Sequence, residues 1–320
     1  MPSDQNKLAV IALGGNALLR NFQKGTIAEQ EENTMETLRN LVFMVKEGYN
    51  LVITHGNGPQ IGNILLRNDA GEQLYGIPPM PLDVCVADSQ GGIGYMIERM
   101  MRNVLMENKI EKDVVTIVTQ VIVKKDDPAL LNPTKRIGKV YSGDDAEKLH
   151  REKGWIYKNS PKQKDGWRRV VPSPMSVKIF NRHSINTIAR NGAIVIASGG
   201  GGIPVYYDEN NMLQPVEGVI DKDYASALLA SNISADEFYI LTDVPYVYLD
   251  FNTPKQKAIE FLDYKDAKNA LDQGQFGEGN MAPKITACLY FIKHGGSKSI
   301  ITEAKKLEDK KYGTKITREY

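Results

Sequence analysis

The sequence predicts an α/β fold in which a mostly parallel sheet of about eight strands has helices on both faces. Short, nearly continuous apolar runs, such as that from Leu8 to Leu13, are typical of strands buried on both faces. Segments with apolar residues at helical spacing separate these runs. Several runs end in glycine, beginning with Gly14 and Gly15. Because ligands in such sheets bind outside the carboxyl ends of the strands, these glycines predict a phosphate-rich ligand along that edge.

The first half of the chain repeats a strand and helix pattern. Apolar residues at helical spacing run from Thr26 to Glu47, and Gly48 ends the segment. Pro59 follows a glycine turn and favours the start of another helix, whose amino terminus would be an anion site. The elements predicted here are a strand at 8–13, a helix at 26–47, a strand at 50–54, helices at 60–67 and 82–107, and a strand at 114–123.

The stretch 124–171 interrupts this pattern, because it is polar, rich in turns and basic. It holds 13 Lys and Arg against 7 Asp and Glu, a local charge of +6 in a chain whose total is +1. An insertion of this length is either a functional element or a solvated excursion. Trp155 and Trp167 favour an ordered, protruding subdomain. With prolines near both ends as hinges, we expect this subdomain to act as a lid.

The second half returns to the earlier pattern and contains another glycine turn, Gly199 to Gly202. A loop with Asp221, Lys222 and Asp223 then leads into a strongly apolar helix. The elements predicted here are a helix at 177–191, a strand at 193–197, a hairpin at 206–216, the helix after Asp223, a strand at 238–242, a helix ending at Lys293, and strands at 299–302 and 314–317. We therefore interpret 1–320 as a single domain.

The composition excludes several classes of protein. A net charge of +1 argues against a protein of nucleic acids or membrane surfaces. No run of about 18 apolar residues could span a membrane, and the polar amino terminus lacks a signal sequence, which predicts a cytoplasmic protein. Cys85 and Cys288, the only cysteines, lie in apolar surroundings without metal-ligand spacing, so we expect buried free thiols in a reducing compartment.

Common catalytic motifs are missing from the sequence. It has no P-loop, no dinucleotide-binding glycine pattern, no protein-kinase signature, no nucleophile elbow and no pair of histidines spaced as metal ligands. A single loop lysine or glycine pair is usually a surface feature, but here several lie together at predicted strand ends. Such a set fits phosphoryl transfer, in which positioning and charge neutralisation do most of the work. The charged members are Lys135, Lys222, Lys284, Asp221, Asp223 and Asp243.

A series of motifs spanning nearly the whole chain resembles the carbamate kinases of the amino-acid kinase superfamily. The motifs are Ala12-Leu13-Gly14-Gly15-Asn16-Ala17, Thr54-His55-Gly56-Asn57-Gly58-Pro59-Gln60, Ser89-Gln90-Gly91, Asn132-Pro133-Thr134-Lys135, the run from Ser198 to Pro204, Val219-Ile220-Asp221-Lys222-Asp223, Leu241-Thr242-Asp243-Val244 and Met281-x-Pro283-Lys284. The resemblance implies a three-layer αβα sandwich, a homodimer and interconversion of ADP plus carbamoyl phosphate with ATP plus carbamate, using Mg²⁺. Carbamate is already an anionic nucleophile, so such a reaction needs no general base.

The resemblance also implies a role for individual residues, with 1–190 as the acceptor half and 191–320 as the nucleotide half. Around carbamoyl phosphate it places Gly14, Gly15, Asn16, Gly56, Asn57, Gly58, Gly199, Gly200, Gly201 and Gly202. Facing the nucleotide it places Lys222, Asp243, Val244, Tyr248, Gly279, Met281, Pro283 and Lys284. The catalytic set is Lys135, Lys222, Lys284, Asp221 and Asp223, with the two aspartates also holding Mg²⁺. For Asp223, capping of the following helix is the alternative.

Two positions depart from the family pattern. Ala12 stands where related acid kinases have a lysine, so Lys135 in the insertion is the candidate substitute for the missing cation. Arg136 stands where the family usually has proline, which leaves preference for a related carbamate open. The expected role is ATP formation in fermentative arginine breakdown. Another acid kinase of the same fold and a catalytically silent ligand sensor are the alternatives.

Overall fold

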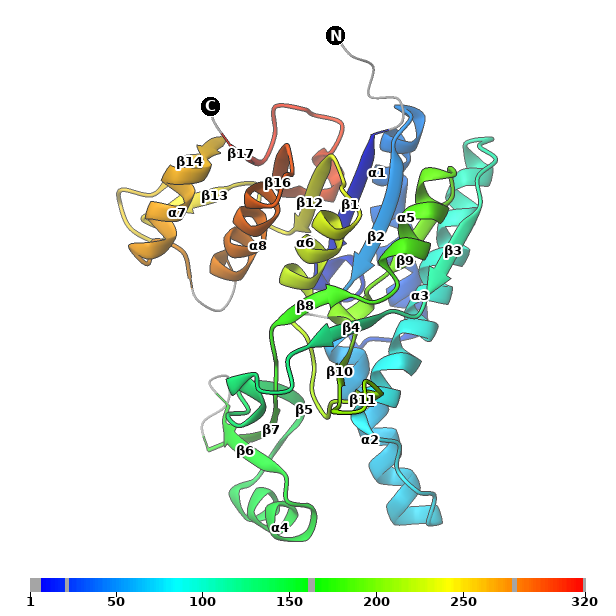
Figure 1. Cartoon of the computed structure of the whole chain (residues 1–320), viewed down its shortest axis with the longest axis vertical. Coiled ribbons are helices and arrows are strands. Elements are labelled where there is room, and N and C mark those ends of the chain that lie inside the picture. Colours follow the sequence, from blue (N-terminus) through cyan, green and yellow to red (C-terminus); the bar gives the residue numbers. More distant parts are fainter. Residues whose placement is uncertain (1–6, 21–22, 161–164, 278–280, 319–320) are drawn as a thin grey trace.

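The computed structural model describes residues 7–20, 23–160, 165–277 and 281–318 (Figure 1). An eight-stranded sheet, in the order β15-β17-β16-β12-β1-β2-β9-β3, forms its body. Only β16 and β17 pair antiparallel, so the predicted mostly parallel sheet is confirmed. The strands are β1 (Leu8–Leu13), β2 (Asn50–His55), β3 (Val114–Ile117), β9 (Ile194–Ala197), β12 (Glu237–Thr242), β15 (Phe261–Asp263), β16 (Lys298–Glu303) and β17 (Thr314–Thr317).

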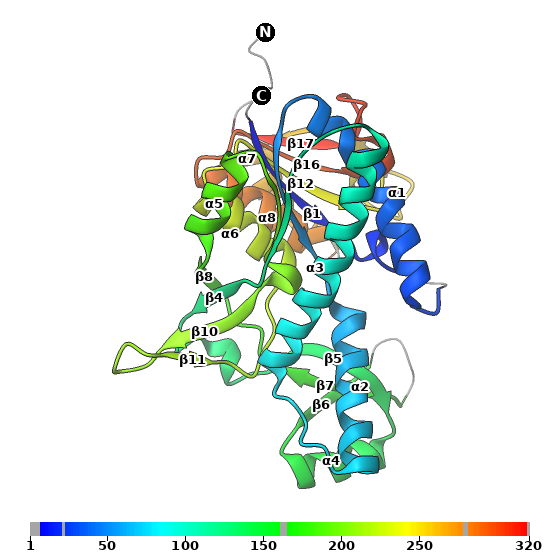
Figure 2. The same ribbon diagram turned by 90° about the vertical axis from the view of Figure 1, so that its right-hand side faces the viewer.

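Helices cover both faces of this sheet. They are α1 (Ile27–Lys46), α3 (Leu82–Glu107), α5 (Arg182–Arg190), α6 (Lys222–Asn232), α7 (Tyr264–Asp272) and α8 (Met281–Lys293). β1 is buried throughout, and its side chains alternate between two cores: Val10 packs with α5 to α8, while Ile11 packs with α1 and α3. Figure 2 shows the two helix layers on opposite sides of the sheet. The three-layer αβα sandwich is therefore confirmed.

Local sequence explains where several helices begin and end. Thr26 caps α1: its hydroxyl accepts the Glu29 backbone N–H, and the Glu29 carboxylate accepts the Thr26 N–H. α3 has the bounds that the sequence predicts. α2 (Gly58–Tyr75) is longer than the predicted helix at 60–67 and ends at Gly76, whose φ is 65°. Only one side chain of α2 is buried, so apolar spacing could not reveal its second half.

The predicted strand at 114–123 is wrong, because the chain divides it between two sheets. Its second part is β4 (Gln120–Val123), which belongs to a four-stranded sheet in the order β11-β10-β4-β8. Thr119 makes the turn between the two parts: its hydroxyl donates to the Ile117 carbonyl at 2.7 Å and accepts the Ser198 N–H at 2.9 Å. The apolar run continues through this turn, so the run alone did not reveal it.

The predicted helix at 177–191 is also wrong in its first part. The chain forms strand β8 (Ser176–Ile179) and becomes helical only at α5. β8 pairs antiparallel with β4, and this tertiary pairing outweighs the helical spacing of the sequence. The same sheet contains β10 (Ile203–Tyr207) and β11 (Leu213–Pro215), which confirm the predicted hairpin.

Residues 124–171, which we call the arm, project from the body (Figure 1). They hold a three-stranded sheet in the order β5-β7-β6 and a helix. The elements are β5 (Lys135–Tyr141), α4 (Gly143–Lys153), β6 (Ile156–Asn159) and β7 (Trp167–Val171). The arm packs against α2: Ile137 and Val171 share an apolar cluster with Ile61. The lid function of the arm stays a prediction.

The part after β12 holds elements that the sequence analysis did not predict. They are α7, β15 and the hairpin of β13 (Val247–Leu249) and β14 (Lys257–Ile259), which are too short for apolar spacing to identify. Cys85 and Cys288 are buried and free, as predicted. Among the described residues, no helix is long and apolar enough to cross a membrane.

Candidate active site

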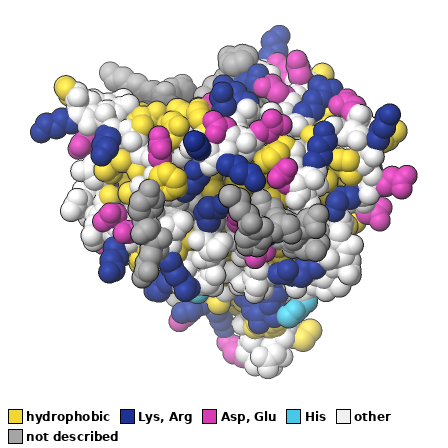
Figure 3. All heavy atoms as spheres, turned by 90° about the horizontal axis from the view of Figure 1, so that it is seen from above, with side chains coloured by type: hydrophobic (Ala, Val, Ile, Leu, Met, Phe, Trp, Pro, Cys, Tyr) yellow, Lys and Arg dark blue, Asp and Glu magenta, His cyan; other side chains and the backbone are white. Residues whose placement is uncertain are grey.

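A cleft lies between the body and the arm, at the carboxyl ends of β1, β2 and β12. Its volume is about 1810 Å³. Pockets for a single small ligand are usually about 300–1,000 Å³, so two substrates could bind together. Among the described lining residues, nine are Lys or Arg and five are Asp or Glu, an excess of four positive charges. On the face seen from above in Figure 1, by contrast, both signs are intermixed (Figure 3). The cleft therefore suits ligands with several negative charges.

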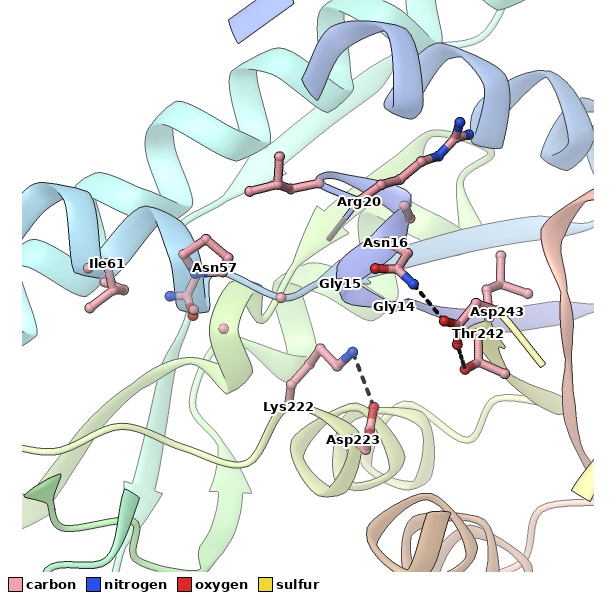
Figure 4. Close-up of a pocket in the computed structure, with 18 of the residues that line it drawn as sticks. Gly14, Gly15, Asn16, Arg20, Asn57, Ile61, Lys222, Asp223, Thr242 and Asp243 are labelled. Atoms are coloured by element: carbon pink, nitrogen blue, oxygen red, sulfur yellow. Dashed lines mark hydrogen bonds and ion pairs between the residues drawn. The ribbon is translucent and has the colours of Figure 1, made fainter. Parts of the chain in front are cut away.

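The tip of β1 forms the floor of the cleft together with the tip of β12 (Figure 4). A Cβ at Gly14 would lie 2.5 Å from the Leu241 carbonyl oxygen, so only glycine lets the two strands approach this closely. The Asn16 side-chain amide then donates to Asp243 at 2.7 Å, which joins the two tips. This contact fixes the backbone that follows β1.

The start of α6 brings three charged side chains to the cleft. Asp221 caps the helix, because its Oδ1 accepts the backbone N–H groups of Asp223 and Tyr224, both at 3.1 Å. The alternative role of Asp223 as the helix cap is therefore wrong. The other oxygen of Asp221 lies 3.3 Å from Nζ of Lys135 on the arm. Asp221 thus links the arm to the body.

Asp223 lies between two lysines. Its Oδ2 is 2.8 Å from Nζ of Lys284, and its Oδ1 is 3.4 Å from Nζ of Lys222. Lys222 also donates to the Leu13 carbonyl at 3.0 Å, which holds its ammonium at the end of β1. We call Lys222, Asp223 and Lys284 the buried triad, since their side chains are 17%, 10% and 16% exposed.

Burial and charge oppose each other within the buried triad. Burial alone would raise the pKa of Asp223, but Lys222 and Lys284 outweigh it, so this pKa lies below its ordinary value. Burial lowers the pKa of Lys222, and the attraction of Asp223 offsets this only in part. Two cations are thus held in place by one carboxylate.

His55 is the last residue of β2 and precedes the loop of Gly56 and Asn57. It is fully buried, and its Nδ1 lies 2.9 Å from the Gly56 carbonyl oxygen, so this nitrogen carries the proton. Burial lowers the pKa of His55 to about 4, with a smaller contribution from the charge of Lys222. The imidazole is therefore neutral near pH 7 and adds no charge next to the buried triad.

The glycine turn after β9 packs against this loop. Gly200 has φ of 64°, and a Cβ there would lie 2.1 Å from Nδ2 of Asn57, so the turn needs glycine on both counts. Asn57 in turn donates to the Ser89 hydroxyl at 2.9 Å. Both Asn57 and Gly200 line the cleft, and their contact positions the loop of Gly56 and Asn57.

Comparisons with known proteins identify the family of the chain. The model of the amino acid kinase family matches residues 7–303. Carbamate kinase of Pyrococcus horikoshii is 47% identical over 96% of this chain and 98% of its own length. Carbamate kinase of Lentilactobacillus hilgardii is 42% identical over 97% of this chain and 96% of its own length. The structure of carbamate kinase from Giardia lamblia bound to AMP-PNP matches with a TM-score of 0.91 and 38% identity, covering 98% of both chains.

The chain belongs to the carbamate kinase family. As in its relatives, a kinase fold spans nearly the full length. The structure brings most of the predicted site residues to one cleft. These are Gly14, Gly15, Asn16, Gly56, Asn57, Gly58, Lys135, Gly200, Asp221, Lys222, Asp223, Asp243, Val244, Met281, Pro283 and Lys284. Their individual roles stay predictions.

A few predicted site residues are not in the lining. Gly199, Gly201 and Gly202 are buried and do not line the cleft. Tyr248 lies on β13, where its ring is 6.0 Å from that of Phe251. The prediction for Gly279 falls outside the described residues.

The sequence analysis missed several cations of the cleft. They follow no glycine tip and stand in no recognised motif, so only the tertiary structure brings them to the site. Arg136 was noted only as a departure from the family pattern. The additional cations are Arg20, Lys24, Lys139, Arg168 and Lys305.

The carboxylates do not build a metal site by themselves. Among the described residues, no three His, Cys, Asp or Glu side chains are grouped to hold a metal ion. Both oxygens of Asp221 already have partners, and Asp223 lies between two ammonium groups. A cation bound here would have to compete with lysines, which is a poor fit for a resident metal.

Proposed function

We propose that this enzyme transfers a phosphoryl group from carbamoyl phosphate to ADP, yielding carbamate and ATP, and catalyses the reverse reaction. The buried triad carries this proposal, because it holds two lysines at glycine-tipped strand ends in a cleft with room for two substrates. The relatives from Pyrococcus horikoshii and Lentilactobacillus hilgardii, which are carbamate kinases, support it. Formation of ATP in fermentative arginine breakdown is the role that we propose for the reaction.

The chemistry needs positioned cations and no general base. An oxygen of the ADP β-phosphate forms a bond to the phosphorus of carbamoyl phosphate, and the bond from phosphorus to the carbamoyl oxygen breaks. Carbamate leaves as an anion, so no proton has to move. Lys222 and Lys284 stabilise the charge on the transferring group, and they need little reorganisation because Asp223 holds both.

The two substrates occupy opposite parts of the cleft in this proposal. Asn16, Asn57 and the glycines near them surround carbamoyl phosphate, and Lys135 supplies the cation that Ala12 does not. The nucleotide lies along Asp243, Val244, Met281, Pro283 and Lys284, with Tyr248 and Gly279 further out. The relative from Giardia lamblia bound to AMP-PNP supports a nucleotide site in this fold.

Mg²⁺ enters this proposal with the nucleotide, as part of the substrate. Phosphate oxygens of ADP or ATP supply most of its ligands, since Asp221 and Asp223 are already paired with lysines. The two aspartates then orient the lysines and add at most a ligand to the metal.

We also propose a cytoplasmic homodimer, by similarity to the family, and closure of the arm over bound substrate.

A coupled assay of ATP formation tests the proposal. We expect ADP and carbamoyl phosphate to yield ATP, while acetyl phosphate and aspartyl phosphate yield far less. Lys284→Ala should lower turnover by about 10²–10³, and circular dichroism checks that the variant is folded. ADP binding without ATP formation from carbamoyl phosphate would contradict the proposal and favour a ligand sensor. Faster turnover with another acyl phosphate would favour a different acid kinase.

A further inference from the structure

Two neighbouring arginines of β7 have opposite surroundings. Arg169 is 8% exposed, lies 2.8 Å from the carboxylate of Glu217 and stacks 4.0 Å above the ring of Trp155. Arg168 points to the other face of the sheet, since side chains alternate along a strand. Its Nε is inaccessible and has no hydrogen-bond partner. The charge of Arg169 is thus balanced by a carboxylate, whereas among the described residues the charge of Arg168 is not.

The register of the arm's sheet places two more cations on the face of Arg168. Lys158 pairs with Arg168 directly, and Arg136 pairs with Val170, two residues further along β7. Burial is the main cause that lowers the pKa of Arg168, and the charge of the nearby Arg136 is the second cause. Arg136 donates to the Asn159 carbonyl at 3.1 Å, and Lys158 to the Asn132 side chain at 3.5 Å.

No carboxylate balances these charges in the part of the chain that the structure describes. The described ion pairs of the arm involve Lys125, Lys135, Lys153, Arg169 and the helix α4, but none involves Arg136, Lys158 or Arg168. Like charges that lie close together without a counter-ion repel one another. Because Arg136 and Arg168 also line the cleft, an anion in the cleft could reach both.

We propose that Arg136 and Arg168 form a subsite for a phosphoryl dianion on the arm side of the cleft. Guanidinium groups bind phosphate oxygens with paired N–H donors, and both arginines line the cleft without an ion-pair partner among the described residues. The dianion is either the phosphoryl group of the entering carbamoyl phosphate or free inorganic phosphate. The first source rests on the proposed function, whereas the second does not.

A fluorescence titration with inorganic phosphate tests the subsite directly. Trp155 and Trp167 are the only tryptophans, so their emission reports on the arm, and Trp167 precedes Arg168. At constant ionic strength, the tryptophan emission of the wild type should change as phosphate is added and become constant when the subsite is saturated. Arg168→Gln and Arg136→Gln should each weaken the affinity about tenfold or more, because each removes a charge-assisted donor pair.

Arg151→Gln is the matched control, because it removes one arginine from the same arm without touching the cleft. Arg151 is 70% exposed on α4, and among the described residues its ion pair is with Glu147 of its own helix. Its loss should leave the phosphate affinity unchanged. Arg168→Lys keeps the charge but not the fork of donors, and should fall between the wild type and Arg168→Gln. Melting temperatures show whether each variant is folded, and Arg136→Gln carries the test if both Arg168 variants unfold.

Steady-state kinetics on the same variants identifies the source of the dianion. A tenfold rise in KM for carbamoyl phosphate, with KM for ADP within twofold, assigns the subsite to the substrate. Weaker phosphate binding with an unchanged KM assigns it to free phosphate. If the wild type binds phosphate through both arginines but forms no ATP, the subsite stands and the proposed function fails. Phosphate affinities of Arg136→Gln and Arg168→Gln equal to that of Arg151→Gln would overturn the subsite.

Discussion

Two aspartates at the start of α6 contact lysines, and the contacts of one are buried whereas that of the other is exposed. Asp223 holds Lys222 and Lys284 with side chains that are at most 17% exposed. Asp221, two residues earlier, meets Lys135 at 3.3 Å with side chains that are 40% and 46% exposed. The contacts of Asp223 lie within the body, whereas the contact of Asp221 joins the body to the arm.

This difference in burial makes the contacts of Asp223 permanent and the contact of Asp221 reversible. Breaking a buried ion pair costs about 3–5 kcal/mol, because the remaining charge has no solvent to stabilise it. An exposed pair contributes only about 0–1 kcal/mol and weakens with salt. The buried triad is therefore fixed before substrates bind, whereas the contact of Lys135 with Asp221 can open at little cost. The proposed closure of the arm over substrate requires a reversible contact of this kind.

Asp223→Asn should have the largest effect, because it leaves two buried ammonium groups without a counter-charge. We expect turnover to fall by about 10³ or more and the free energy of unfolding to fall by about 3 kcal/mol. Turnover and urea denaturation measure the two effects.

Asp221→Asn is the matched control for stability, since asparagine also caps helices well. It should change the free energy of unfolding by less than about 1 kcal/mol. Equal destabilisation by both variants would contradict the distinction between the buried and the exposed contact.

Lys135→Ala should separate activity from stability. Turnover should fall by about 10²–10³ through loss of one cation on the transferring group, while the unfolding free energy changes by less than about 1 kcal/mol. ADP affinity should stay the same, because this lysine comes from the arm. Stopped assays and calorimetric ADP titration measure these quantities. Nearly full activity would mean that another cation of the cleft replaces the one that Ala12 lacks.

His55→Gln should make the free energy of unfolding less dependent on pH in the acid range. Between pH 6.5 and 4 the unfolded chain takes up a proton on His55 that the folded chain does not, so stability falls as the pH falls through this window. The pKa difference corresponds to about 3 kcal/mol. Denaturation curves of wild type and variant at pH 7 and pH 4.5 test this. An unchanged pH dependence in the variant would show that other groups cause the acid sensitivity.

Lys222→Arg should cause the smallest predicted change in the pH dependence, a shift of the alkaline limb of activity. Because burial lowers the pKa of Lys222, the wild type should lose activity as the pH rises, at a lower pH than an exposed lysine would cause. A guanidinium keeps its charge throughout, so the alkaline limb of the variant should move to higher pH even if its maximal rate is lower. Identical alkaline limbs in both enzymes would assign the titration to a different group.

The sequence by itself determined the parts of this protein that depend on local pattern. An apolar run followed by Gly14 identifies a strand and its tip, and the apolar spacing of α3 predicts its bounds, since each signal lies within a few turns or residues. The motif around Lys222 identified the charged start of α6 in the same way. Most of the predicted site residues accordingly reach one cleft.

Only the tertiary structure decided which partner each segment and charge would meet. The runs at 114–123 and 177–191 divide because β4 and β8 pair with each other, and neither segment records its partner. Arg168 and Arg169 are neighbours of the same kind, yet one meets Glu217 while the other faces the cleft. The physical reason is that burial and pairing depend on residues far apart in the chain, whereas propensity and spacing depend on near ones.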